Sequence, residues 1–335
     1  MPQNVSLKKV LIFGASSINE TQPCENDYAV AQACRCFHEK GLEVVLISPN
    51  PNSVITDKCL VAQIYIEPLT LETVKRIIVK EKVDSLFPVF AGQSGLTLAL
   101  QLSVSTFLST NNVSLLGVGP ESINNSQEFQ SFKDTMLKIN EPCIPSKMAG
   151  SLKDAVLFAE SSVGYPVIVR PSVLFGRAPG KIAASQEEMI EVVTQCLKRS
   201  PLHQVLVEKC IAGWKEIDFV LLRDEYGHCI SVGSVENFDP VGTSAGRYIS
   251  VSPAASLSEE EMQILQSAAI RITNAFGVVG ECNIKFGLKP NSKEYVVIEV
   301  NPRATEFTPF VSKATGYPVP RVSSLLAMGY SIPEA

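Results

Sequence analysis

The segment GVVGECNIKFGLKPNSKEYVVIEVNPR, residues 277–303, decides the fold of the C-terminal part of this chain. Its runs CNIKFGL (282–288) and YVVIEVN (295–301) are joined by the turn PNSK, a pattern that predicts two antiparallel strands. Further strands are predicted at 216–224, 228–238 and 248–253, and a helix at 258–276. Because these strands form hairpins, they predict an α+β domain rather than a second doubly wound sheet.

The first 125 residues show a different pattern, in which short β-rich runs alternate with segments of helical spacing. That alternation is typical of βαβ units and predicts a Rossmann-like parallel sheet. The predicted strands are KKVLIFG (8–14), LEVVLIS (42–48), SLFPVF (85–90) and VSLLGVG (113–119), and the predicted helices are 27–40, 71–82 and 95–107. We therefore place a domain boundary near residue 125, which divides this α/β chain into domains at 1–125 and 126–335.

A small αβ unit is predicted at the start of the second domain, from about residue 146 to about residue 206. Its predicted elements are a helix at 152–162, the strands PVIVRPS (166–172) and KIAAS (181–185), a helix at 187–199 and the strand QVLVEK (204–209). The two strands PVIVRPS and KIAAS flank a loop that contains glycine. The remainder, 207–335, forms the body of the second domain.

Composition limits the function classes. The 335 residues are 45% hydrophobic, which suffices for two cores, and the formal charge of -5 argues against a nucleic-acid or anionic-membrane partner. The nine cysteines form no CxxC pair and only three histidines are present, so we expect reduced thiols and no zinc site. The first apolar run is too short for a signal peptide, and no stretch approaches a membrane span. We expect a cytoplasmic protein.

Two stretches carry candidate chemistry. In VVIEVNPR, Glu299 and Asn301 face the same side of a strand because side chains alternate, and oxygen ligands of this kind suit Mg²⁺. Arg303 follows on the same side, with a guanidinium that suits phosphate or carboxylate. In VRPSVLFGRAPGKI (169–182), Arg170 at a strand end precedes a loop whose backbone N–H groups either cradle phosphates or merely join two strands.

The segment VEKCIAGWKEID (207–218) adds two carboxylates, Glu208 and Glu216, beside Trp214. They either hold a ribose or are solvated.

Several strings together are similar in order and spacing to a known family: GWKEIDFVLLRD, SVENFDPVG, residues 277–303 and SKATGYPVP. The likeness extends upstream through KKVLIFG, the tetrapeptide Glu25 to Tyr28, PNPNSVITD, YIEPLT and the pair Gly92 and Gln93. The chain resembles the carboxyphosphate-forming, N-terminal half of the large subunit of carbamoyl phosphate synthetase, from Lys8 to about Pro333. The resemblance implies a Rossmann-like pre-ATP-grasp domain followed by an ATP-grasp domain with a lid and a body.

The resemblance also implies a nucleotide site between lid and body, with ATP and Mg²⁺ as cofactors. It assigns Arg303 and Asn301 to catalysis, and Glu299 and Asn301 to the metal ion. The positions that it assigns to the nucleotide are Arg170, Gly176, Gly180, Glu208, Glu216 and Glu299. In the family, bicarbonate is the second substrate, and a second ATP-grasp half and an amidotransferase are partners, so a second half or a further copy of this chain is expected as partner.

Several reaction-site positions depart from the family pattern. Phe129 stands where an arginine is expected, Lys285 where a metal-binding glutamine is expected, and Glu306 where a second arginine is expected. After the ENFD string, Ser244, Ala245 and Arg247 replace the expected histidine, threonine and aspartate. The lid loop contains Pro179 where the family pattern has glycine and serine. Since phosphoryl transfer depends on cations around the phosphoryl oxygens, catalysis suffers most from these changes.

Three functions remain open from the sequence. The first is a nucleotide-binding protein whose carboxyphosphate chemistry is lost or reduced, which we favour. The second is an active, free-standing ligase half that phosphorylates bicarbonate or another carboxylate. The third is a partner-binding subunit of a synthetase complex. For Lys285 we predict an inward ammonium within about 4 Å of a Glu299 oxygen, so that the metal site is weakened or lost.

Overall fold

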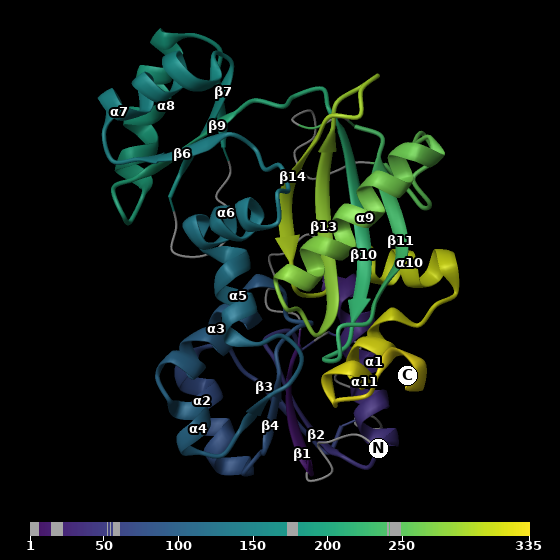
Figure 1. Ribbon diagram of the computed structural model, residues 1–335. Helices are drawn as coiled ribbons and strands as arrows, with labels where there is room; N and C mark the ends of the chain where they lie inside the picture. The colour runs from purple at the N-terminus through teal and green to yellow at the C-terminus, as the bar shows by residue number, and fades with distance from the viewer. Residues whose placement is uncertain are drawn as a thin grey trace.

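The computed structural model describes residues 7–14, 23–51, 53, 55, 61–172, 180–239, 241 and 249–335. Within these ranges the chain forms three sheets, a parallel one followed by a small and a large one that are antiparallel. Figure 1 shows the parallel sheet at the bottom, the small sheet at the upper left and the large sheet at the right. The α/β prediction, Rossmann-like and then ATP-grasp, is confirmed in these elements.

The first sheet has the order β3-β2-β1-β4-β5, and its strands pair in parallel. Its strands are β1 (Lys9–Phe13), β2 (Glu43–Ser48), β3 (Gln63–Ile66), β4 (Ser85–Phe87) and β5 (Ser114–Leu115), and its helices are α1 (Pro23–Glu39), α2 (Leu71–Glu81), α3 (Gly92–Val104) and α4 (Phe107–Thr110). Separate apolar clusters fill its two faces, so helices cover both sides as a doubly wound sheet requires. The edge strand β5 is shorter than predicted, because Gly117 with φ of 83° ends the extended run.

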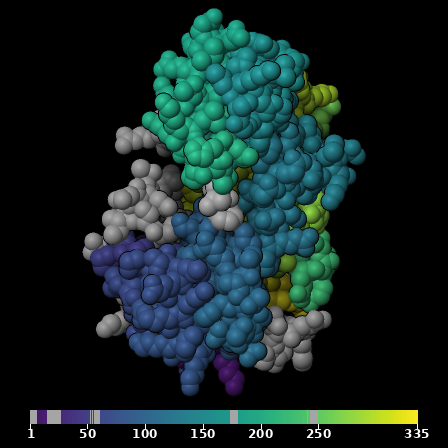
Figure 2. Space-filling model, turned by 90° about the vertical axis from the view of Figure 1, so that its left-hand side faces the viewer, coloured from purple at the N-terminus to yellow at the C-terminus, as the bar shows by residue number. Residues whose placement is uncertain are grey.

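Two short helices, α5 (Pro120–Gln127) and α6 (Phe129–Lys138), connect this domain to the rest. The lid follows with the sheet order β6-β9-β7-β8. Its elements are β6 (Ser146–Ala149), α7 (Leu152–Phe158) continued by the π-helix η2 (Ala159–Val163), β7 (Val167–Pro171), β8 (Lys181–Ala183), α8 (Gln186–Arg199) and β9 (Val205–Lys209). One apolar cluster joins both lid helices to the sheet, and Figure 2 shows the lid above the blue parallel-sheet domain.

The body sheet has the order β12-β11-β10-β13-β14 and antiparallel pairing throughout. Its strands are β10 (Lys215–Arg223), β11 (Cys229–Asn237), β12 (Ser250–Val251), β13 (Gly280–Leu288) and β14 (Tyr295–Asn301), and its helices are α9 (Glu259–Ala275), α10 (Phe307–Thr315), α11 (Val319–Ala327) and the 3₁₀ helix η3 (Ile332–Glu334). The helix α9 covers one face through a large apolar cluster. Part of the other face packs on α10 and α11.

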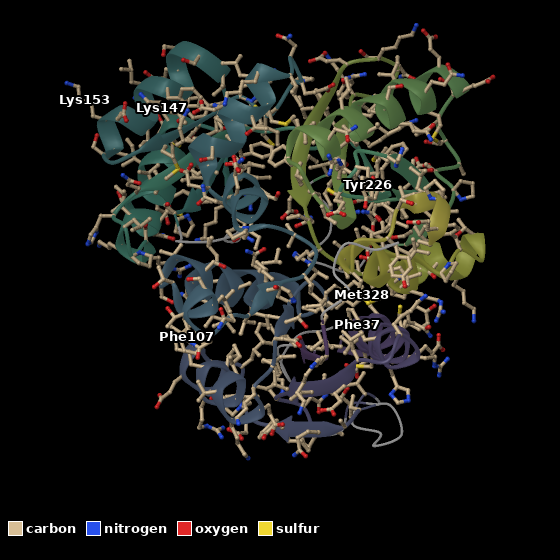
Figure 3. The ribbon with its side chains drawn as sticks, turned by 60° about the horizontal axis from the view of Figure 1, so that its bottom comes forward. Phe37, Phe107, Lys147, Lys153, Tyr226 and Met328 are labelled. Atoms are coloured by element: carbon tan, nitrogen blue, oxygen red, sulfur yellow. The ribbon has the colours of Figure 1, made fainter. Side chains whose placement is uncertain are left out.

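The body is anchored to the first domain by its C-terminal segment. Leu325, Ala327 and Met328 belong to the same apolar cluster as Phe37 of α1, and Figure 3 shows Phe37 and Met328 close together. No helix in the described ranges is long and apolar enough to cross a membrane.

Candidate functional site

Polar side chains alternate along three neighbouring strands of the body sheet. The register pairs Lys285 of β13 with Asp218 of β10 on one side and with Glu299 of β14 on the other. Because side chains alternate in a strand, Cys282, Ile284 and Phe286 face the core under α9, whereas the residues between them face the opposite way. This second face is polar where α10 and α11 do not cover it.

Lys285 lies inward at the centre of this face, as predicted, with 18% of its side chain exposed. Its ammonium donates a hydrogen bond to Glu216 Oε1 over 2.9 Å, and lies 3.9 Å from Asp218 Oδ2. The predicted ion pair with Glu299 is wrong: in the described part of the chain, the carboxylates within 4 Å of this ammonium belong to β10. The reason is electrostatic, since β10 offers two carboxylates on this side and β14 offers one.

The Glu216 carboxylate also accepts a hydrogen bond from Asn237 Nδ2, at 2.6 Å. Burial alone would lower the pKa of Lys285, but Asp218 and Glu216 outweigh it, so the pKa is raised and the amine stays charged. Burial raises the pKa of Asp218 to about 7, although Lys285 opposes the rise and Glu216 and Glu306 add to it. The face therefore holds one fixed cation against several carboxyl groups.

Glu281, on the same strand as Lys285, is a second buried carboxyl group. Burial raises the pKa of Glu281 to about 8, against the hydrogen bond from Thr308 Oγ1 and the charge of Arg303. Arg303 donates from Nη1 to the Ala304 carbonyl oxygen at 3.0 Å, and its Nε has no hydrogen-bond partner among the described residues. Asn301 is opposite Asn283 in the register and is 7% exposed.

On the lid, Arg170 and Glu208 are bound to each other. Arg170 Nε donates to Glu208 Oε2 at 2.8 Å, and Glu208 is 2% exposed. Gly180 packs against this arginine so closely that a Cβ there would lie 2.9 Å from Arg170 Cγ. Glu208 is thus a buried ion-pair partner in the lid, whereas Glu216 belongs to the body cluster.

Several predicted positions lie outside the described residues. They are Gly176, Pro179, Ser244, Ala245 and Arg247.

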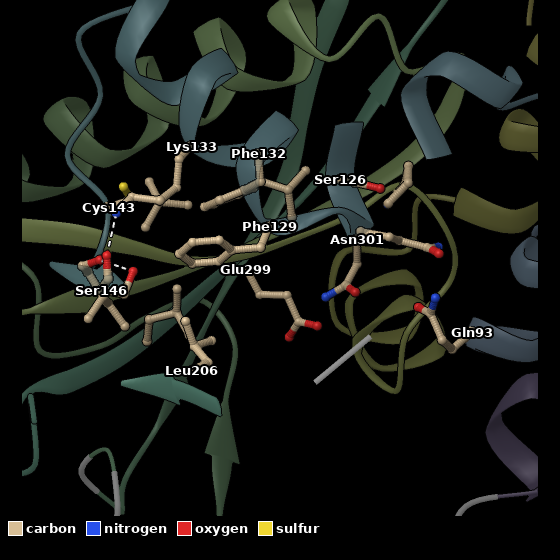
Figure 4. Close-up of a pocket in the computed structure, with 16 residues that line it drawn as sticks. Gln93, Ser126, Phe129, Phe132, Lys133, Cys143, Ser146, Leu206, Glu299 and Asn301 are labelled. Atoms are coloured by element: carbon tan, nitrogen blue, oxygen red, sulfur yellow. Dashed lines mark hydrogen bonds between the residues drawn. The ribbon is translucent and has the colours of Figure 1, made fainter. Parts of the chain in front are cut away.

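A pocket joins the first domain, the lid and the body. Glu299 and Asn301 point into it from β14, Gln93 lies across from Asn301, and Phe129 projects between Glu299 and Ser146 (Figure 4). Lys133 Nζ lies 5.2 Å from the centroid of the Phe129 ring. An aromatic ring therefore lies in the pocket beside Glu299.

The sequence reasoning missed the roles of Asp218, Glu281, Asn283 and Asn237. Their signal was present, because polar residues at every second position in 281–285 and 216–218 mark a polar face of a strand. Gln127 and Lys133 had no comparable signal, since their place in a pocket depends on how the helices α5 and α6 meet the body.

The side chains around residue 285 do not fit a metal ion that this residue would help to bind. An ammonium stands there in place of an oxygen ligand, hydrogen-bonded to Glu216, and like charges repel. Among the described residues, no group of three or more His, Cys, Asp or Glu side chains is arranged to hold a metal ion. The oxygen atoms of Glu299 and Asn301 remain on the same face.

Two family descriptions match this chain. "Carbamoyl phosphate synthase preATP-grasp domain" matches residues 6–125, and "Carbamoyl-phosphate synthase L chain, ATP binding domain" matches residues 129–335. The carbamoyl phosphate synthase large chain of Agathobacter rectalis is 44% identical over 334 residues, and that of Lachnoclostridium phytofermentans is 45% identical over 334. Each alignment covers 100% of this chain and 31% of the relative, so the chain spans about a third of their length.

Solved structures share the fold. A biotin carboxylase from Campylobacter jejuni aligns with a TM-score of 0.78 and 19% identity, covering 98% of this chain and 72% of that one. The biotin carboxylase domain of the Hydrogenobacter thermophilus 2-oxoglutarate carboxylase aligns with a TM-score of 0.78 and 17% identity, covering 97% and 70%. At such identities the likeness concerns the fold alone.

The raised pKa of Asp218 predicts how stability depends on pH. Its folded-state pKa of about 7 lies above the ordinary value, so the folded state keeps a proton that the unfolded state loses, and stability falls as pH rises from about 4 to about 7. Asp218→Asn removes this group. Across that pH window, the unfolding free energy of the variant should therefore fall less than that of the unmodified protein, and the difference should be at least about 1 kcal/mol. Urea unfolding at several pH values measures this.

The matched control for that experiment is Asp134→Asn, on the exposed surface of α6. It should keep the pH profile of the unmodified protein. An Asp218→Asn profile parallel to the unmodified one would contradict the assignment.

Proposed function

Because the chain belongs to the carbamoyl phosphate synthase large-chain family, we propose that it binds ATP or ADP between lid and body and has lost most of its carboxyphosphate-forming chemistry. The observation that carries this proposal is the Lys285 ammonium, which is held by Glu216 and Asp218 at a position where the family pattern has a metal ligand.

The nucleotide part of the proposal rests on the shared fold and the retained residues. The Campylobacter structure is described as a complex with β,γ-ATP, and the Hydrogenobacter structure as a complex with MgADP, ADP and bicarbonate. By analogy, Arg170 and Glu208 of the lid face a nucleotide from one side, and Glu216, Glu299 and Asn301 of the body face it from the other. Gly176 and Gly180 belong to the loop over the phosphates in this proposal.

The loss of chemistry follows from charge. Transfer of a phosphoryl group is accelerated by cations that meet its oxygens. At two positions where the family pattern has arginine, this chain has Phe129 and Glu306, and Glu306 is close enough to raise the pKa of Asp218. The Lys285 ammonium is already hydrogen-bonded to Glu216, which makes it less able to meet a transferring phosphoryl group.

A second candidate function is an active ligase half that phosphorylates bicarbonate or another carboxylate. The retention of Glu299, Asn301 and Arg303 together favours it. In either case, complete carbamoyl phosphate synthesis requires a second ATP-grasp half, supplied by a partner or by further chain. We place this chemistry in the cytoplasm, where the free cysteines of the described ranges would remain reduced.

Nucleotide binding gives the first test. ATP and ADP at millimolar concentration should release heat in calorimetry and raise the melting temperature, because a ligand of the folded state stabilises by about 2.7 kcal/mol at a hundred times its Kd. Arg170→Met should weaken ATP binding about tenfold, as expected for a lost charge-assisted hydrogen bond. Arg199→Met, an exposed arginine at the end of α8, is the matched control and should bind normally. Absence of heat and of a thermal shift with both nucleotides would show that the nucleotide proposal is wrong.

Restoring the family residues gives the second test. The triple variant Phe129→Arg, Lys285→Gln and Glu306→Arg should hydrolyse ATP in a bicarbonate-dependent manner at least about tenfold faster than the unmodified protein. Each single change should do much less, because residues that act on one transition state are not additive. Steady-state phosphate release measures this. An unmodified protein already as fast as a working synthetase would favour the active-ligase alternative.

A further inference from the structure

Two buried polar atoms near the start of β13 lack partners, although their chemistry would suit each other. Glu281 Oε2 and Arg303 Nε both have no hydrogen-bond partner among the described residues. A carboxyl oxygen accepts and a guanidinium N–H donates, and a buried polar group without a partner is costly and uncommon in a folded protein. The two side chains therefore favour a second arrangement, in which these atoms meet.

The strand register brings the two residues to the same part of the polar face. Asn283 of β13 lies opposite Asn301 of β14. Continued by two residues along these antiparallel strands, the same face carries Glu281 and Arg303. Residues opposite each other in this way have Cβ atoms about 5 Å apart, and the Arg303 charge acts to lower the pKa of Glu281. The two side chains are thus neighbours that are not yet hydrogen-bonded.

The Glu281 carboxyl group is held in place, whereas the arginine is free to move. The Glu281 backbone N–H donates to Ser323 Oγ of α11 over 3.1 Å, and Thr308 Oγ1 of α10 donates to Glu281 Oε1. Glu281 is 2% exposed. Arg303 is only half-buried, and a long arginine side chain keeps much rotamer freedom. The guanidinium can therefore reach the fixed carboxyl oxygen by rotating about its own side-chain bonds.

The other charged groups on this face do not compete for Glu281. They are Lys285 on the same strand, Asp218 of β10 and Glu306 at the start of α10. The Lys285 ammonium is already held by Glu216 and lies 3.9 Å from Asp218 Oδ2, and the other two groups are acidic. Arg303 is therefore the cation that the Glu281 carboxylate would attract.

We propose that Glu281 is a positioning residue for Arg303: its carboxylate holds the guanidinium against β13, and its protonated form releases the guanidinium to a phosphate. This inference rests on the proposed function, which brings the phosphates of a nucleotide to this face, and it adds a regulation of that site by pH. Protonation removes the negative charge that competes with the phosphate, so binding of the proton and binding of the phosphate favour each other.

Calorimetric titration of the full chain with ADP, at about pH 7.5 and about pH 9.5, tests this inference. The pKa of Glu281, about 8, lies inside this window, whereas that of Asp218, about 7, lies below it. ADP keeps its charge throughout, since a phosphate monoester has its second pKa near 6. The Kd of the unmodified protein should rise at least about fivefold across the window, because a proton is bound together with the ligand.

Two variants separate Glu281 from other groups that titrate. Glu281→Gln has nearly the same shape, keeps an oxygen for Thr308 and cannot ionise, so its Kd should change less than about twofold across the window. Glu259→Gln, exposed at the start of α9, is the matched control and should keep the full pH dependence. A structural role of Glu281 alone would not change the pH profile of ADP binding.

Proton uptake gives a second readout that needs no variant. At about pH 8.5, titrations in two buffers of different ionisation enthalpy should show uptake of at least about 0.3 proton per ADP bound. ADP binding without proton uptake, with the same Kd at both pH values, or with an undiminished pH dependence in Glu281→Gln would overturn this inference and leave nucleotide binding in place. Absence of ADP binding at both pH values would overturn the proposed function, and this inference with it.

Discussion

The ion pair between Lys285 and the two carboxyl groups of β10 fixes the charge at the centre of the polar face of the body sheet. Glu216 and Asp218 lie on the same side of one strand, with the ammonium 2.9 Å from the first and 3.9 Å from the second. Removing one partner of a buried pair leaves an uncompensated charge and typically costs about 3–5 kcal/mol. The fold therefore holds its own cation in the centre of this face.

The rest of the site is arranged around that cation. On one side, β14 presents Glu299 and Asn301 to the pocket that joins the first domain, the lid and the body. On the other, Asn237 of β11 fixes the Glu216 carboxylate. The lid contributes the ion pair of Arg170 and Glu208, and the helix α11 ties the body to the first domain. Each of these elements positions a polar group of the proposed site.

Local sequence patterns were sufficient for most of the fold. The alternation of β-rich and helical runs predicted the parallel sheet, and the hairpin pattern of 277–303 predicted the pair β13 and β14. The inward orientation of Lys285 was predicted from the resemblance, in which the glutamine expected at this position faces inward. Its partner did not, because the choice between Glu299 and Glu216 depends on which neighbouring strand offers more negative charge. The pocket that joins the first domain, the lid and the body could not be predicted from the sequence either, since Gln93, Gln127 and Phe129 meet only through tertiary packing.

The dependence of ATP affinity on Mg²⁺ tests most directly whether Lys285 has replaced a metal ion. Calorimetric titration with ATP in EDTA and then in millimolar Mg²⁺ compares the unmodified protein with Lys285→Gln. The built-in ammonium predicts that the affinity of the unmodified protein changes less than about threefold, whereas the variant gains about tenfold or more from Mg²⁺. An unmodified protein that binds ATP tightly only when Mg²⁺ is present would contradict the account.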